Sequence, residues 1–249
     1  MSGSLVVVGT GPGKAELMTP ATEAVLARAT DLVGYGPYLD RVRLRADQCR
    51  HASDNRVELE RARLALSLAA AGRQVVVVSG GDPGVFAMAA AVFEAVETGD
   101  PAWRGLDIRV EPGVTAMLAA AAEVGAPLGG DFCAISLSDN LKAWSTVERR
   151  LKAAAEADFV IALYNPASKA RPTQLGKALE LLGTVKAPET PVLFVRAAGT
   201  PEAHVVLSTL GTADPTRADM RTLVIVGAST TRQVGRWVYT PRGERGGRS

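Results

Sequence analysis

Hydrophobic residues in this chain occur in short continuous runs, and each run leads into a glycine-rich turn. The clearest run is Val75-Val76-Val77-Val78 within Gln74–Ser79, where apolar positions do not alternate with polar ones. A strand with this pattern is covered by helices on both faces, as in a parallel sheet. Apolar residues at helical spacing follow the turns, so the pattern predicts repeated strand–turn–helix units of an α/β fold.

The first half of the chain contains four predicted strands and four predicted helices. Thr19 is expected to cap a helix that begins at Pro20, and Gly72 is expected to close the helix before the valine run. The expected strands are Leu5–Val8, Asp31–Val33, Gln74–Ser79 and Asp107–Glu111, and the expected helices are Pro20–Ala29, Asn55–Ala71, the segment after Gly84 to about Glu97, and Val114–Glu123.

The same rhythm restarts after a cluster of glycine and proline between Gly125 and Gly130, which is the best candidate for a linker. Beyond it we expect strands at Phe132–Leu137, Phe159–Leu163, Val192–Val195 and Leu223–Val226, a hairpin strand at Val205–Ser208, and helices at Ser145–Glu156 and Pro172–Leu182. We therefore predict two α/β domains, residues 1–126 and 127–240, followed by a flexible, Gly- and Arg-rich tail at 241–249.

Composition and charge exclude several classes of protein. The 249 residues are 47% hydrophobic and carry 28 basic against 26 acidic side chains, which is typical of a folded protein without a broad cationic face for nucleic acid. The Ala-rich stretch Val114–Leu128 is too short and interrupted to span a membrane. The apolar run Leu5–Val8 is too short for a signal peptide, so we expect a cytoplasmic protein.

The metal-binding residue types are sparse. Cys49 and Cys133 show no CxxC spacing, and His51 and His204 have no second ligand at a metal-binding spacing. We expect no metal site.

The first glycine turn, Gly9-Thr10-Gly11-Pro12-Gly13, raises the possibility of a dinucleotide site. The fingerprint requires a small residue where Lys14 stands, and Pro12 removes one phosphate-binding amide. The acidic residue expected after the second strand is replaced by Gly34-Tyr35-Gly36. An NAD(P)-dependent oxidoreductase is therefore kept only as an alternative, and no GxxxxGK[ST] phosphate loop occurs.

Two further turns, Gly80-Gly81-Asp82-Pro83 and Glu111-Pro112-Gly113-Val114-Thr115-Ala116, each close a strand and open a helix. One carries a carboxylate and the other a hydroxyl, a combination suited to a zwitterionic amino-acid ligand. Taken singly, Asp82 could also be a helix cap and Thr115 a first-turn residue.

The ordered series Val8–Gly13, Ser79–Phe86 and Pro112–Ala116 resembles the tetrapyrrole methylases, S-adenosylmethionine-dependent enzymes of corrin and sirohaem synthesis. The match extends over nearly the whole chain. Within the family, the stretches Gly34–Asp40, Phe132–Asp139 and Phe159–Pro166 are similar to the members of the cobalamin pathway that methylate precorrin-3B at C-17 and contract its ring. One departure is that the first loop continues with Lys14-Ala15 where the family usually has an acidic residue and proline.

The resemblance implies a cleft between two α/β domains and S-adenosyl-L-methionine as methyl donor, leaving S-adenosyl-L-homocysteine. The donor-binding residues that it implies are Gly81, Asp82, Val85, Thr115 and Ala116 in the first half and Tyr164, Asn165, Ala197, Gly227 and Ala228 in the second. Related methylases are usually homodimers.

Methyl transfer depends mainly on positioning, whereas ring contraction also requires a proton to leave the C-20 hydroxyl. Candidates for that catalytic role are Asp82, Ser136, Ser138, Asp139 and Ser229. The tetrapyrrole would lie against Gly11, Pro12, Gly13, Lys14 and Arg196, and its carboxylates would meet cations among Lys14, Lys142, Lys169, Arg171 and Arg196. A non-catalytic protein that binds tetrapyrroles is the remaining alternative.

Overall fold

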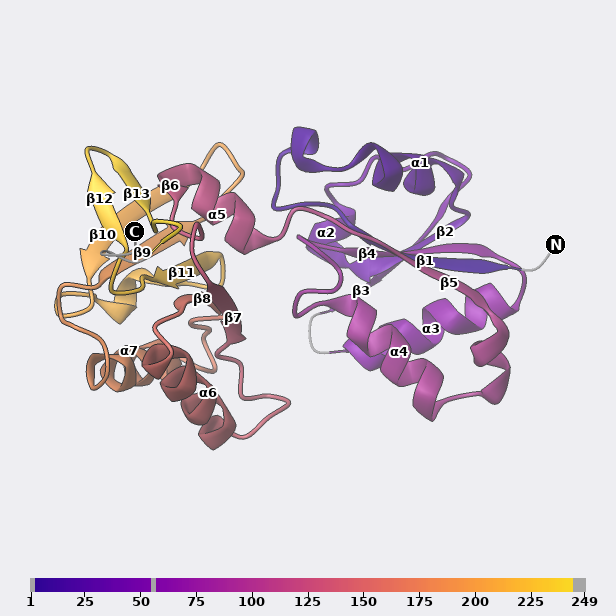
Figure 1. The fold of residues 1–249 in the computed structure, drawn as a ribbon. Helices are drawn as coiled ribbons and strands as arrows, with labels where there is room; N and C mark the ends of the chain where they lie inside the picture. Colours follow the sequence, from indigo (N-terminus) through magenta and orange to yellow (C-terminus); the bar gives the residue numbers. More distant parts are fainter. Residues whose placement is uncertain (1–2, 55–56, 244–249) are drawn as a thin grey trace. The chain divides into compact units, whose positions relative to one another are not determined.

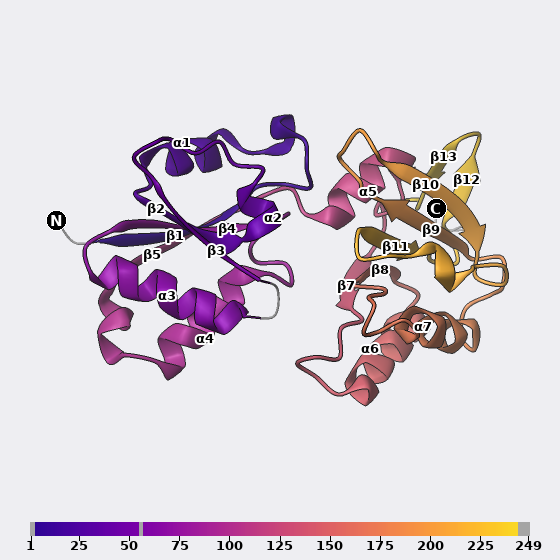
Figure 2. The same ribbon diagram turned by 180° about the vertical axis from the view of Figure 1, so that it is seen from behind.

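The computed structural model describes residues 3–54 and 57–243, and its contacts divide the chain into two units, Met1–Ala116 and Met117–Ser249 (Figures 1 and 2). Each unit has its own sheet and its own hydrophobic core, which confirms the predicted α/β class. The described part of the chain contains no helix long and apolar enough to cross a membrane.

The first unit contains a parallel sheet of five strands in the order β3-β2-β4-β1-β5. Its strands are β1 (Ser4–Gly9), β2 (Asp31–Tyr35), β3 (Cys49–Ser53), β4 (Gln74–Ser79) and β5 (Asp107–Glu111). Its helices are α1 (Pro20–Arg28), α2 (Gly36–Leu39), α3 (Glu58–Ala70) and α4 (Met88–Thr98), with short 3-10 helices at Ala15–Leu17 and Pro101–Gly105.

The valine run of β4 contacts helices on both faces of this sheet. Val75 and Val77 pack in one core with residues of α3 and α4, whereas Val76 and Val78 pack in another with Leu26 of α1 (Figure 1). Successive strand residues point to opposite faces, so a continuous apolar run is what a doubly covered strand requires.

Capping residues, glycines and apolar runs in the sequence predicted the positions of most of these elements correctly. Thr19 caps α1, since its side chain accepts a hydrogen bond from the Thr22 amide at 3.1 Å. Gly72 follows α3 with φ 87°, a conformation that favours glycine. The helix predicted from Asn55 begins at Glu58, and residues 55 and 56 lie outside the described residues. The polar edge strand β3 has no hydrophobic pattern and was not predicted.

The second unit contains a mixed sheet in the order β10-β9-β11-β8-β7. Its strands are β7 (Phe132–Ser136), β8 (Val160–Tyr164), β9 (Pro191–Arg196), β10 (His204–Thr209) and β11 (Thr222–Val226). Helices α6 (Trp144–Glu156) and α7 (Gln174–Gly183) pack in its core, and a 3-10 helix spans Pro215–Arg217. The predicted hairpin is confirmed, because β10 pairs antiparallel with β9.

Strand direction decides which residues of this sheet share an edge. β7 and β8 are parallel, and β11 is antiparallel to both β8 and β9. The carboxyl ends of β7, β8 and β9 therefore lie at one edge, and the carboxyl end of β11 lies at the opposite edge.

The glycine cluster before β7 is packed inside the second unit. Helix α5 (Ala116–Val124) leads into β6 (Gly125–Ala126), which pairs with β13 (Trp237–Tyr239), and β13 forms a hairpin with β12 (Arg232–Val234). Gly129 and Gly130 both lie close to Thr240. The contacts divide the units between Ala116 and Met117, at the start of α5, whereas the predicted boundary lies between residues 126 and 127. Of the predicted flexible tail, residues 244–249 lie outside the described residues.

Candidate functional site

Three turns meet at the carboxyl edge of the first sheet, following β1, β4 and β5. The amide of Gly11 donates to the Gly81 carbonyl oxygen at 3.2 Å, and the amide of Gly81 donates to the Gly11 carbonyl oxygen at 2.8 Å. A Cβ at Gly9 or Gly113 would lie 2.5 or 2.3 Å from the Gly81 oxygen. The close approach of these backbones therefore requires glycine.

Asp82 connects two of these turns. Its Oδ1 accepts a hydrogen bond from the Gly84 amide at 2.8 Å, and its Oδ2 accepts one from the Gly113 amide at 3.0 Å. Both carboxylate oxygens therefore have backbone donors. Asp82 therefore holds the two turns together. To act as a catalytic base, one of the roles expected from the sequence, it would have to give up one of these hydrogen bonds.

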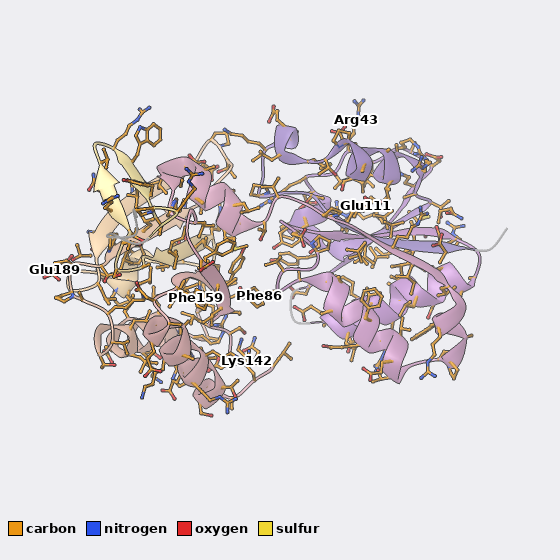
Figure 3. The ribbon with its side chains drawn as sticks, in the orientation of Figure 1. Arg43, Phe86, Glu111, Lys142, Phe159 and Glu189 are labelled. Atoms are coloured by element: carbon orange, nitrogen blue, oxygen red, sulfur yellow. The ribbon has the colours of Figure 1, made fainter. Side chains whose placement is uncertain are left out.

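The first-half residues predicted to bind the donor lie around the same turns. Gly81 has φ 65°, and a Cβ placed there would be 3.8 Å from the Thr115 Cα and 3.9 Å from the Ala116 amide nitrogen. The Val85 amide donates to the Asp82 carbonyl at 3.3 Å. Phe86, with φ 52°, precedes α4, and Glu111 ends β5 (Figure 3).

These turns offer small residues and backbone groups in place of charged side chains. This composition suits a ligand with an amino-acid group, a sulfonium and an adenosine, since none of these needs a phosphate-binding lysine. The described residues of the first unit therefore fit the methyl donor that the sequence implies.

The first glycine loop is shaped by its own backbone. Gly11 has φ 72°, and a Cβ there would lie 2.6 Å from the Leu17 carbonyl oxygen. Pro12 and Gly13 are half-buried, whereas Lys14 is exposed and its carbonyl accepts a hydrogen bond from the Leu17 amide at 3.1 Å. The loop thus keeps its tight geometry with Lys14 at its solvent side.

In the second unit, Ser136, Tyr164 and Asn165 lie at the shared carboxyl edge of β7 and β8. Asn165 Nδ2 donates to Ser136 Oγ at 2.9 Å, and the Ser138 amide approaches the same oxygen at 3.3 Å. Asn165 has φ 52°. The Tyr164 hydroxyl accepts a hydrogen bond from the Met117 amide at 3.0 Å, in the first turn of α5.

A second polar group extends from this edge. Asp139 Oδ2 accepts a hydrogen bond from Gln174 Nε2 at 3.1 Å, and Arg171 Nε lies 4.0 Å from Asp139 Oδ1. Arg171 also donates to the Asn165 carbonyl at 3.3 Å. Gln174 was not predicted, because in the sequence it reads as an ordinary helix residue, yet its buried Oε1 has no hydrogen-bond partner.

Arg196 ends β9 at the same edge of the sheet, and Ala197, which follows it, has φ 52°. Arg196 is already paired, since its Nε donates to Asp219 Oδ2 at 2.7 Å. Burial raises the pKa of the Asp219 carboxyl, but hydrogen bonds from Arg196 and Thr222 outweigh it and lower that pKa overall. A substrate carboxylate would have to compete with Asp219 for Arg196.

The other candidate cations of this unit have different surroundings. Lys142 lies in the loop before α6 (Figure 3), where burial and the neighbouring Arg150 lower the pKa of its ammonium group. Lys169 is exposed.

Gly227, Ala228 and Ser229 do not join Tyr164 and Asn165. They follow β11, whose Val226 is paired with Ile161 near the start of β8, while Tyr164 ends that strand. Because strands rise about 3.3 Å per residue, the separation along the sheet is on the order of 13 Å. The family resemblance grouped Gly227 and Ala228 with Tyr164 and Asn165, whereas the antiparallel direction of β11 places them at opposite edges of the sheet.

Ser229 has a structural partner at its own edge of the sheet. Its Oγ donates to Asp158 Oδ2 at 2.6 Å, and Asp158 Oδ1 also accepts from Lys186 Nζ at 2.9 Å. Ser229 therefore connects the end of β11 to the α6–β8 turn. Among the described residues, no three His, Cys, Asp or Glu side chains are grouped so that they could hold a metal ion.

Comparisons with known proteins agree in one family. Residues 4–214 match the model of the Tetrapyrrole (Corrin/Porphyrin) Methylases. The chain is 60% identical to a precorrin-3B C(17)-methyltransferase of Sinorhizobium sp., with 97% of each chain covered. It is 41% identical to a probable cobalt-factor III C(17)-methyltransferase of Salmonella typhimurium, covering 96% of this chain and 98% of that protein.

Two solved structures support the same fold. The methyltransferase CobJ superposes with a TM-score of 0.94 at 56% identity, covering 96% of this chain and 100% of that one. The uroporphyrin-III C-methyl transferase from Thermus thermophilus, complexed with S-adenyl homocysteine, gives a TM-score of 0.69 at 25% identity, covering 90% and 97%.

Proposed function

This chain belongs to the tetrapyrrole methylase family, and from that premise we propose that it transfers a methyl group from S-adenosylmethionine to C-17 of precorrin-3B and contracts the ring to precorrin-4. The observation that carries the proposal is the 60% identity to a precorrin-3B C(17)-methyltransferase over 97% of both chains. The chain is thus a methyltransferase of cobalamin biosynthesis.

Residues of the first unit are proposed to bind the donor through small side chains and backbone groups. Gly81, Thr115 and Ala116 would lie against it, with Val85 beside them and Asp82 holding the turns in place. The donor supplies an electrophilic methyl group on a sulfonium. The bound S-adenyl homocysteine of the Thermus thermophilus relative supports this choice of donor.

From the second unit we propose Tyr164, Asn165 and Ala197 for the donor site, because they share one sheet edge. Gly227 and Ala228 lie at the other edge, so their predicted contribution has no support from the topology.

For the proton of the C-20 hydroxyl we propose Asp139 as acceptor. Its side chain is 30% exposed and therefore reachable, and Gln174 and Arg171 orient it. Ser136 and Ser138 lie at the same edge and would orient the substrate. Both oxygens of Asp82 accept backbone hydrogen bonds, and Ser229 lies at the opposite edge of the sheet. Among the described contacts of Asp139, only Oδ2 accepts a hydrogen bond, so Asp139 is the carboxylate best placed for general base chemistry.

We propose metal-free precorrin-3B as the natural substrate. The identity to the precorrin-3B enzyme is 60%, compared with 41% to the probable cobalt-factor III enzyme.

We also propose a homodimer, because the side chains of Val234 and Trp237 in the β12–β13 hairpin are 57% and 46% exposed. Light scattering should give twice the 26.0 kDa of one chain, and a monomer at micromolar concentration would contradict the dimer.

The function is tested by incubating the protein with S-adenosylmethionine carrying a radiolabelled methyl group, together with precorrin-3B or its cobalt-containing counterpart. We expect label in the macrocycle, with faster transfer to the metal-free substrate. A protein that binds the macrocycle but transfers no label would instead be a non-catalytic carrier. Dependence on a nicotinamide cofactor would support the oxidoreductase alternative.

A further inference from the structure

Arg61 of α3 is a buried cation whose partners carry no full negative charge. The residue is only 5% exposed. Its Nε donates to Ser53 Oγ at 2.7 Å, Nη2 donates to the Asp54 backbone oxygen at 2.6 Å, and Nη1 lies 3.2 Å from Met88 Sδ. Within the described part of the chain, Arg61 forms no ion pair with a carboxylate.

Two other ion pairs among the described residues each join a buried group to a group of opposite charge. The Lys186 side chain is 3% exposed and pairs with Asp158 at 2.9 Å. Arg73 pairs with the buried carboxylate of Asp31 at 2.7 Å. Burying an unpaired charge is costly, so Arg61 differs from these residues in a way that calls for an explanation.

The internal hydrogen bonds of Arg61 do not explain its charge. A hydroxyl oxygen, a carbonyl oxygen and a thioether need only N–H donors, and an uncharged amide side chain could supply two of them. Burial lowers the pKa of the Arg61 guanidinium, with partial compensation from Glu58 and Tyr38, yet an arginine stays ionised at neutral pH. Glu58 is exposed and makes no ion pair with Arg61.

Arg61 lies at the carboxyl edge of the first sheet, beside the turn that contains Gly81. Ser53 ends β3, and Met88 begins α4 directly after that turn. Tyr38 lies on the other side, since a Cβ at Gly80 would be 2.8 Å from its ring. Burial raises the pKa of the Tyr38 phenol, so its hydroxyl is a neutral hydrogen-bond donor.

A guanidinium has five N–H donors in a planar fork, and three are used here. One N–H on each terminal nitrogen remains, which is the arrangement that binds a carboxylate through both oxygens. Tyr38 adds a further donor next to it.

We propose that Arg61 and Tyr38 form a carboxylate-binding subsite at this edge, adjoining the Gly80–Val85 turn. The proposal rests on the proposed function, because both reactants there carry carboxylates: the methionine group of the donor, and the acetate and propionate groups of the macrocycle. The ligand's carboxylate would supply the negative charge that the fold does not give to Arg61.

The test compares Arg61→Gln and Arg61→Lys with Arg63→Gln, an exposed arginine on the same helix. Calorimetry measures binding of S-adenosylhomocysteine and of methylthioadenosine, which lacks the amino-acid group. Fluorescence quenching measures binding of uroporphyrin, which carries eight carboxylates. Circular dichroism confirms that each variant is folded.

We expect Arg61→Gln to lower the affinity for one of the two carboxylate ligands about 30-fold or more. Arg61→Lys should lower the same affinity less, and Arg63→Gln should leave it unchanged. If S-adenosylhomocysteine binds more weakly and methylthioadenosine binding is unchanged, Arg61 binds the carboxylate of the donor. If only uroporphyrin binds more weakly, Arg61 binds a carboxylate of the macrocycle.

A folded Arg61→Gln variant that binds both ligands like the wild type overturns the subsite. If Arg61→Gln does not fold, Tyr38→Phe keeps the ring against Gly80 and should weaken the same ligand about fivefold, and unchanged binding then overturns the proposal. Wild-type protein that binds neither ligand contradicts the proposed function itself, so the two failures are distinguishable.

Discussion

At the scale of single residues, the turns of the first unit depend on space that only glycine leaves. The sequence showed these glycines and suggested a ligand site, but it could not show that Gly9, Gly81 and Gly113 lie against one another. Nor could it show that both oxygens of Asp82 accept backbone hydrogen bonds, because this depends on two turns about 30 residues apart meeting at one carboxylate.

Replacing Gly113 by alanine tests this packing. Its Cβ would lie 2.3 Å from the Gly81 carbonyl oxygen, so the two turns must separate. We expect a loss of about 1–3 kcal/mol in the free energy of unfolding and weaker binding of S-adenosylhomocysteine. Gly105→Ala is the control, because nothing lies within 4 Å of its added Cβ. If urea titrations give the same free energy of unfolding for Gly113→Ala and Gly105→Ala, the turns tolerate separation.

Asp31 makes the stability of the first unit depend on pH. Burial alone raises the pKa of this carboxyl, but hydrogen bonds from Arg73, Thr30 and His51 outweigh it and lower the pKa below the ordinary 3.8. A lowered folded-state pKa means that the stabilisation is fully present above the unfolded pKa. It is lost as the pH falls through the folded value.

We therefore expect Asp31→Asn to reduce the free energy of unfolding by about 2 kcal/mol at pH 7, and by clearly less at pH 3. Asp107→Asn, which removes an exposed ion pair at 3.5 Å, should have little effect at either pH. Urea midpoints at the two pH values provide the measurement. If Asp31→Asn lowers the free energy of unfolding as much at pH 3 as at pH 7, the charge of Asp31 does not provide this stabilisation.

At the scale of elements, the apolar segments were predicted well and the polar or very short ones were not. β4 and β5 have the predicted bounds, because a continuous or regularly spaced apolar run leaves little choice. The edge strand β3 is polar, and β6, β12 and β13 have two or three residues each, so no hydrophobic period marks them.

Strand direction was the second element-level property that the sequence did not reveal. The segment Leu223–Val226 is a strand as expected, but it runs antiparallel to β8. Ser229 therefore lies with Asp158 and Lys186, away from Ser136.

This arrangement predicts different results for two serine variants. Ser229→Ala should lower stability by about 1 kcal/mol and leave kcat/KM within about twofold, because only the hydrogen bond to Asp158 is lost. Ser136→Ala leaves Asn165 Nδ2 without its acceptor and should lower kcat about tenfold or more. Steady-state kinetics together with thermal unfolding separates the two effects, and a larger kinetic loss for Ser229→Ala would contradict the assignment.

At the scale of the whole molecule, two α/β units carry the residues of one proposed reaction. The sequence resemblance rested on short motifs at the ends of strands, and the family match over residues 4–214 agrees with it. Composition alone indicated only that the protein is folded and has no broad cationic face for nucleic acid. The division into units required knowing that the glycine cluster pairs with β13, a contact more than 100 residues away.

The position of the transferred carbon in the product distinguishes C-17 methylation with ring contraction from any other methyl transfer. The protein is incubated with precorrin-3B and S-adenosylmethionine whose methyl group carries carbon-13, and the product is examined by carbon-13 nuclear magnetic resonance. We expect a single enriched methyl group on C-17 of a ring-contracted macrocycle. Label at another carbon, or C-17 methylation of a macrocycle that keeps its C-20 bridge, would contradict it.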